Sequence, residues 1–142
     1  MSGYKDPRFP IELGGKEYHL YFSLSVLEEM QEKYGGFDKL NEVTSGKDGL
    51  KNVIWLLTRA VNEGLAYGHF LKTGDVEGAE VMSEKVAGLL LNTANLSDIK
   101  TDLFKAFAFG VKGNNDPPED EDPDDEDDEE NEKGNTEAGK VT

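Results

Sequence analysis

Histidine, serine and carboxylate side chains are the groups in this sequence that could do chemistry, because it contains no cysteine. The two histidines, His19 and His69, have no second ligand at the spacing that metal sites use. The serines lack the Gly-x-Ser-x-Gly pattern of a nucleophile elbow. Glu28 and Glu29 are expected on the solvent-facing arc of a helix, which is the ordinary place for paired charges. The sequence therefore predicts no catalytic residue and no metal site.

Two further patterns resemble ligand-binding loops but lack their essential parts. The glycines at Gly35-Gly36 and from Gly46 to Gly49 do not follow a strand, and they lack the Lys-Ser ending of a phosphate-binding loop. The acidic run Asp120–Asp125 lacks the turn glycine and the distal glutamate of a calcium loop, and it contains a proline. We therefore expect no cofactor, and the predicted function is not enzymatic.

The charge of the chain is concentrated at one end. The 142 residues include 30 acidic and 15 basic ones, a net charge of −15, and residues 114–142 alone hold 14 acidic residues and two lysines. Since this segment has almost no apolar surface to bury, we predict a disordered acidic tail. An acidic protein repels nucleic acid and anionic membranes, and no apolar run approaches the roughly 20 residues of a membrane span. Neither nucleic acid nor membrane is therefore expected as a partner.

A single folded body is expected over residues 9–113, after a flexible N-terminus over residues 1–8. The body begins with two runs of alternating apolar and polar residues on either side of Gly14-Gly15, which is typical of a β-hairpin with a two-residue loop. This register places Ile11 opposite Tyr18. It also places Phe9 opposite Leu20 and Glu12 opposite Glu17. Because two strands alone are marginally stable, the hairpin must pack on the rest of the folded body.

About five helical segments are predicted after the hairpin, which gives a mainly α (α+β) fold. The first runs to Gly35-Gly36, and Ser23 and Ser25 are equally suited to cap it, the latter with Glu28 as a capping box. The residues expected on its buried stripe are Leu24, Leu27, Met30 and Tyr34.

The centre of the fold is predicted to be a long helix from about Leu50 to Leu71, capped by Asp48, after a short helical piece around Phe37, Leu40 and Val43. Its small residues Ala60, Gly64 and Gly68 recur every four positions and form a ridge on which another helix is expected to pack. The residues expected on its core stripe are Leu50, Val53, Ile54, Leu57, Ala60, Val61, Gly64 and Leu65.

Two more helices complete the predicted body. The fourth is expected to be capped by Asp75 and to run from Val76 to about Asn92. Its apolar residues at helical spacing are Val76, Ala79, Met82, Val86, Leu89 and Leu90. Ser97 is the expected cap of the last helix, in which the inner stripe is Ile99, Leu103, Ala106 and Phe107. Phe104 and Phe109 are expected to point elsewhere. This aromatic-rich end is predicted to be either a partly exposed adhesive surface or fully buried within the monomer.

Three elements follow one another in the sequence: the run from Ile11 to Phe22, the helix that ends in Tyr34-Gly35-Gly36, and the long helix after Phe37 and Leu40. Their order resembles that of the tail assembly chaperones of long-tailed (siphovirus-type) bacteriophages of Gram-positive hosts. The resemblance covers about residues 9–112 and rests on the order and spacing of the elements.

The resemblance implies a chaperone in viral tail assembly that acts in the host cytoplasm and is absent from the mature virion. Such a protein binds the tape measure protein, keeps it soluble and helps deliver it to the tail tube protein. It also implies a longer form made by a programmed frameshift, for which Gly139-Lys140 is the kind of dipeptide that a slippery run encodes.

The client surface is predicted to include Phe104, Phe107 and Phe109, and self-association is a further expectation. Two alternatives come from other classes of protein. One is an acidic mimic of DNA that occupies the basic groove of a nucleic-acid-binding protein, although the folded body is nearly neutral. The other is a structural subunit of the tail or of the head-to-tail connector.

Overall fold

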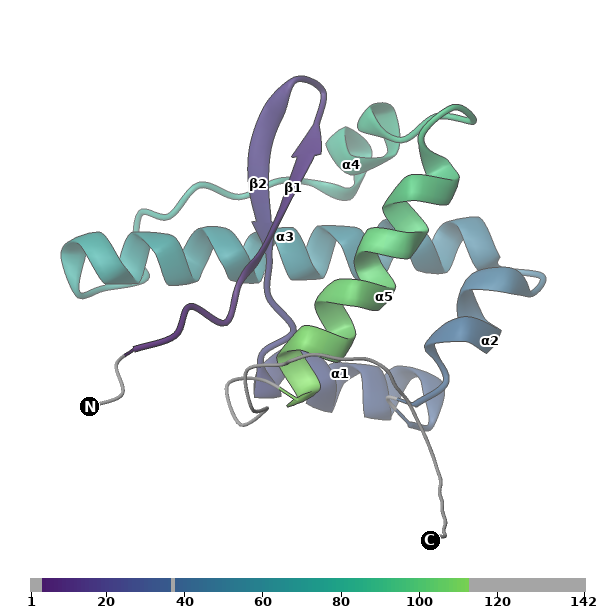
Figure 1. Cartoon of the computed structure of the whole chain (residues 1–142), viewed down its shortest axis with the longest axis horizontal. Helices are drawn as coiled ribbons and strands as arrows, with labels where there is room; N and C mark the ends of the chain where they lie inside the picture. Colours follow the sequence, from purple (N-terminus) through teal and green to yellow (C-terminus); the bar gives the residue numbers. More distant parts are fainter. Residues whose placement is uncertain (1–3, 37, 113–142) are drawn as a thin grey trace, which may run out of the picture.

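The computed structural model describes residues 4–36 and 38–112, and it has the predicted mainly α (α+β) architecture. Two antiparallel strands precede five helices within these residues: β1 (Phe9–Leu13), β2 (Lys16–Leu20), α1 (Leu24–Tyr34), α2 (Leu40–Ser45), α3 (Gly49–Thr73), α4 (Glu84–Leu90) and α5 (Leu96–Lys112). The hairpin and α5 both run across α3, the longest element (Figure 1). The predictions for Phe37, for residues 114–142 and for Gly139-Lys140 lie outside the described residues.

The hairpin has the predicted loop and register. Ile11 pairs with Tyr18, and Glu12 lies opposite Glu17. Gly14 and Gly15 have φ angles of 59° and 79°, and this pair of left-handed conformations is what a two-residue loop requires of its central residues. The remaining predicted pair, Phe9 with Leu20, is also present. The alternating pattern is therefore sufficient to predict this element.

Helix α1 begins after Ser23, which is the cap that the structure selects. The Ser23 hydroxyl accepts a hydrogen bond from the Val26 N–H at 3.3 Å and donates one to the Glu63 carboxylate on α3. This contact determines which side of α1 faces α3, so Val26 and Met30 are buried. The prediction that Leu24 is buried was wrong, because Leu24 is 84% exposed at the start of the helix. Gly35 ends the helix with φ of 83°.

Helix α3 confirms the predicted long helix, but its cap and its buried residues differ from the prediction. Asp48 stands at the cap position without a side-chain hydrogen bond to the helix. Leu50 is 64% exposed rather than buried, whereas Leu56, which the predicted stripe omitted, is fully buried. Leu56 is buried because α3 is covered on several sides, by the hairpin, α1, α2, α4 and α5. A single stripe is too narrow for such a central helix.

The ridge Ala60, Gly64 and Gly68 does not receive another helix. Strand β2 and the residue after it lie there instead, and the Tyr21 N–H donates a hydrogen bond to the Ala60 carbonyl at 3.1 Å. A Cβ atom on Gly64 would lie far inside van der Waals contact with the His19 carbonyl. The small residues therefore admit the backbone of a strand, which is thinner than a helix with its side chains.

The fourth helix is shorter than predicted. Residues 74–83 are not helical, since Gly78 has a φ of 89° and the Asn62 side chain bonds both the N–H and the carbonyl of Met82, at 2.7 and 2.8 Å. Helix α4 begins only after Ser83, whose hydroxyl accepts a hydrogen bond from the Val86 N–H. Asp75 therefore caps no helix, although its carboxylate accepts from the N–H two residues later.

Helix α5 begins two residues earlier than a cap at Ser97 implies, at Leu96, so Ser97 lies inside it and is not its cap. The turn before it is held by two asparagines: the Asn92 carboxamide oxygen accepts from the N–H of Ala94 and of Asn95, and Asn95 bonds back to the Asn92 N–H. The expected inner residues Ile99, Leu103 and Ala106 are buried.

Residues 4–8 contact α3 rather than standing clear of it. The hydroxyls of Tyr4 and Tyr67 are 2.8 Å apart, and the Arg8 guanidinium lies 5.5 Å from the centre of the Tyr67 ring. Arg8 also forms two side-chain hydrogen bonds with the Asp6 carboxylate, at 2.9 and 3.0 Å. These contacts align the chain along α3 before it enters β1.

Candidate functional site

The three predicted client-binding phenylalanines lie in three different environments. Phe107 is half-buried and makes an edge-to-face contact with the core residue Phe22, with ring centres 5.6 Å apart. Phe109 is 38% exposed, and its ring centre lies 6.4 Å from that of Phe9. Phe104, expected to point away from the core, is half-buried against it and also lines a surface hollow. The three rings therefore do not form one patch.

An apolar hollow lies beside the N-terminal half of α3. It has a volume of about 220 Å³, and its walls come from α3, from α4 and from the turn that leads into α5. Its lining residues are Leu50, Ile54, Gly88, Leu91, Asn92, Thr93 and Leu96. Most of these side chains are apolar and none is charged. We name this hollow the apolar end.

A second hollow adjoins the first and shares Thr93 and Leu96 with it. Its volume is about 430 Å³, and its other lining residues are Asn41, Ser97, Lys100, Thr101 and Phe104. We name it the polar end, and the two hollows together the α3–α5 groove. The groove thus changes from mostly apolar to hydroxyl- and lysine-lined along its length.

The walls of the groove are positioned by partly buried side-chain hydrogen bonds. Asn52 on α3 donates to the Val43 carbonyl of α2 at 2.8 Å and accepts from the Tyr34 hydroxyl at 3.2 Å. Asn95 donates to the Leu90 carbonyl at 3.0 Å and so fixes the α4–α5 turn. Since these bonds set the spacing of the helices, the groove is a feature of the folded body.

Glycine at position 88 keeps the apolar end open. A Cβ atom there would lie 3.7 Å from the Ile54 Cδ1, which is ordinary contact, so alanine fits but a larger side chain would enter the hollow. Leu50, which lines the hollow, is 64% exposed, and Leu89, the neighbour of Gly88 in the sequence, is 69% exposed without lining it. Large apolar side chains that remain in water beside a hollow are typical of binding surfaces.

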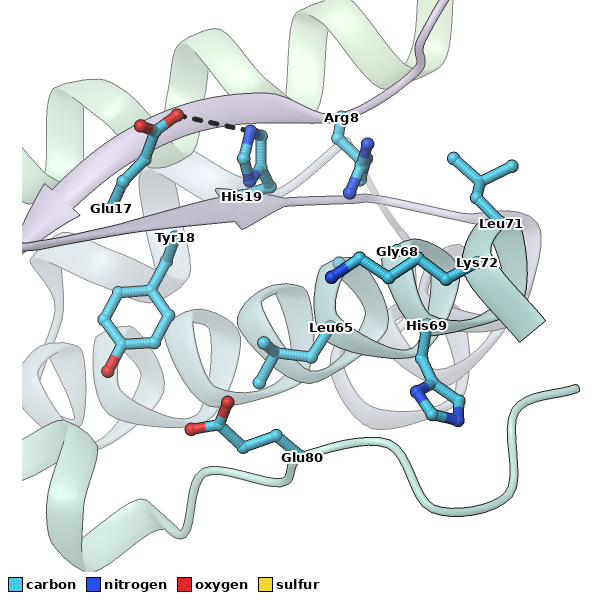
Figure 2. A pocket seen from close by; sticks show the side chains of 11 residues that line it. Arg8, Glu17, Tyr18, His19, Leu65, Gly68, His69, Leu71, Lys72 and Glu80 are labelled. Carbon is cyan, nitrogen blue, oxygen red and sulfur yellow. Dashed lines mark ion pairs between the residues drawn. The ribbon is translucent and has the colours of Figure 1, made fainter.

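A separate polar pocket of about 400 Å³ lies between β2, the C-terminal half of α3 and the segment before α4 (Figure 2). Both of its carboxylates have partners: the His19 ring lies 3.4 Å from Glu17, and Glu80 pairs with Lys16 at 3.4 Å. The His69 ring bonds the Glu77 carbonyl. No group of three or more histidine or carboxylate ligands comes together in residues 4–36 and 38–112.

The shifted pKa values belong to contacts that hold the fold together. The Arg59 guanidinium forms two hydrogen bonds with Glu29, at 2.8 and 2.9 Å, and lowers the pKa of that carboxyl. Burial raises the pKa of Tyr34 to about 12, and it also raises the pKa of Asp102. Glu29, Tyr34 and Asp102 line neither the groove nor the polar pocket. Arg8 does line the polar pocket, and its hydrogen bonds with Asp6 raise its pKa.

No helix among the described residues is long and apolar enough to cross a membrane. Comparisons with family models, with curated proteins and with solved structures gave no match to this chain. The groove was not predicted from the sequence. The only signals for it were the exposed leucines and Gly88, whose significance depends on packing between α3, α4 and α5.

Proposed function

We propose that this chain is a non-enzymatic tail assembly chaperone that binds helical segments of a phage tape measure protein in the α3–α5 groove. In this proposal it acts in the host cytoplasm, delivers its client to tail tube subunits and is absent from the mature virion. The order of a hairpin, a short helix and a long helix supports the proposal, since the resemblance of the sequence rests on that order.

The observation that carries the proposal is the uncharged apolar end of the groove, with the exposed Leu50 in its wall. An amphipathic helix places apolar side chains at intervals of three and four residues, and such a row fits an apolar groove between helices. Burying one large aliphatic side chain contributes about 1.5–3 kcal/mol, so one or two anchors give weak binding for each chaperone. Weak binding suits a carrier that must later release its client.

Many copies on one client would compensate for the weak binding of each. A tape measure protein offers a series of helical segments, and copies that occupy neighbouring segments would shield the apolar stripe along its length. The acidic segment at residues 114–142, with its net charge of −12, would keep such an assembly soluble. Tube subunits that form a closed polymer would then displace the copies by competing for the same stripe.

The test is co-expression of the full chain with the tape measure protein from the same gene cluster. We expect the client to become soluble and to co-purify with the chain. Gly88→Phe should abolish both effects because the ring fills the apolar end. Gly88→Ala is the matched control and should retain them, since its Cβ fits the space beside Ile54.

Two results would contradict the proposal. A client that stays insoluble beside the unsubstituted chain would exclude a chaperone that acts alone. If folded Gly88→Phe protein solubilised the client as well as Gly88→Ala does, the groove would not be the binding site. Circular dichroism of both variants shows whether each has folded.

A further inference from the structure

The polar end of the groove has hydrogen-bond donors without partners. The side chains of Asn41, Thr93, Ser97 and Thr101 make no hydrogen bond to other described residues, and Lys100 makes no ion pair with them. No carboxylate lines this hollow. An ammonium group surrounded by hydroxyl and amide donors is suited to carboxylate ligands, because a carboxylate accepts several hydrogen bonds and carries the opposite charge.

The chain itself carries a strongly acidic segment that is long enough to reach this site. Residues 116–130 contain 12 aspartates and glutamates and no basic residue. They follow α5, the helix whose first half lines the polar end. Lys100 and Lys112 are separated along α5 by about 18 Å at the helical rise per residue. The seven residues 113–119 span up to about 23 Å when extended, so the acidic run beginning at Glu119 can return to Lys100.

The polar pocket of Figure 2 is a poorer match for the same segment. It is lined by the carboxylates Glu17 and Glu80, both of which already pair with cationic side chains or with histidine. Arg8, a further cation in its lining, is bonded to Asp6. Lys72 also lines this pocket and forms no ion pair with described residues, but the carboxylates Glu17 and Glu80 would repel an acidic ligand there. No carboxylate lines the polar end around Lys100.

We propose that the acidic segment at residues 116–130 binds in cis to the polar end of the α3–α5 groove, with its carboxylates on Lys100 and the adjacent hydroxyls. The bound segment covers the half of the groove next to the apolar end. If the proposed function holds, the segment and the client bind adjoining ends of one groove.

The test uses the full chain without a client, so that it can fail independently of the proposed function. Since the sequence has no cysteine, Asn131→Cys accepts a single nitroxide spin label directly after the acidic run. The measurement is the loss of amide NMR signals caused by the label, relative to the reduced label. We expect strong losses at residues 93–101 in low salt and recovery near 1 M salt, where the Debye length is about 3 Å.

Two variants locate the contact. Lys100→Glu should restore the signals at residues 93–101. Lys72→Glu is the control, because Lys72, like Lys100, forms no ion pair with described residues, but it lines the other pocket. It should leave the losses unchanged. If Lys100→Glu does not fold, Thr101→Glu, at an exposed position, serves the same purpose.

Three outcomes would overturn the proposal. The first is signal loss confined to the C-terminal end of α5. The second is loss at residues 93–101 that neither salt nor Lys100→Glu changes. The third is equal loss in an isotope-labelled chain mixed with a separate spin-labelled chain, which would mean that the segment binds a second copy and not its own groove.

Discussion

The two halves of α3 meet the rest of the protein differently. Around Gly64 the helix is covered by the backbone of β2, so closely that a methyl group has no space. Around Ile54 it faces Gly88 of α4 across an open hollow. A glycine in a helix contact therefore has two uses, which Gly64 and Gly88 illustrate in turn. One permits close packing, and the other preserves a hollow that a partner can fill.

Substituting Gly64 should have the largest effect on stability. In Gly64→Ala the new Cβ meets the His19 carbonyl, and backbone cannot move aside as a side-chain end can. We expect a loss of about 3 kcal/mol or more in the free energy of unfolding, measured by urea denaturation.

Gly68→Ala is the control for this substitution. Its Cβ would meet the end of the flexible Arg8 side chain, 2.8 Å away, so little net change is expected. Equal stability of Gly64→Ala and the unsubstituted chain would contradict the close strand contact, and with it the contrast between the two halves of α3.

The phenylalanines of α5 should differ in the same measurement. Phe107→Ala removes a ring that packs on Phe22, and because that ring is half-buried we expect a loss of about 2 kcal/mol. Phe109→Ala should cost less than about 1 kcal/mol, since Phe109 is more exposed. If the order were reversed, the contact of Phe107 with Phe22 would contribute less to stability than the more exposed ring of Phe109.

The smallest expected effect concerns the ion pair between Glu29 and Arg59, which joins α1 to the centre of α3. Because Arg59 lowers the pKa of Glu29 in the folded state, the pair stabilises the fold above the unfolded pKa, near pH 4.3, and the contribution is lost as pH falls through the lower folded value. Since Glu29 is partly exposed, we expect less than about 1 kcal/mol.

Glu29→Gln checks this pH dependence. The variant should lose less stability than the unsubstituted chain between neutral pH and about pH 3, in thermal unfolding followed across that range. Identical acid profiles would show that the pair contributes nothing measurable.

Local sequence patterns predicted the elements well where one short-range interaction determines the structure. The alternation around Gly14-Gly15 predicts the observed hairpin register, and Gly35 ends α1 as predicted. Local patterns do not decide between Ser23 and Ser25 as the cap of α1, because the deciding contact, with Glu63, is distant in sequence.

Contacts between distant segments explain the predictions that failed. The periodic apolar residues from Val76 onward suggested a helix, but Asn62 holds Met82 in an extended segment. The ridge on α3 correctly indicated a close approach, but its spacing cannot distinguish a helix from a strand. The groove was missed for the same reason, since its walls come from four separate parts of the chain.

Binding of the client in the α3–α5 groove is tested most directly by photocrosslinking to the tape measure protein from matched positions at the two ends of α3. A photoreactive phenylalanine analogue is placed at Leu50, which lines the groove, or at Leu71, which lines the opposite pocket; both side chains are exposed. The groove model predicts crosslinks to the client from position 50 and not from position 71. Crosslinks from position 71 alone, or from neither position while the client remains soluble and bound, would contradict it.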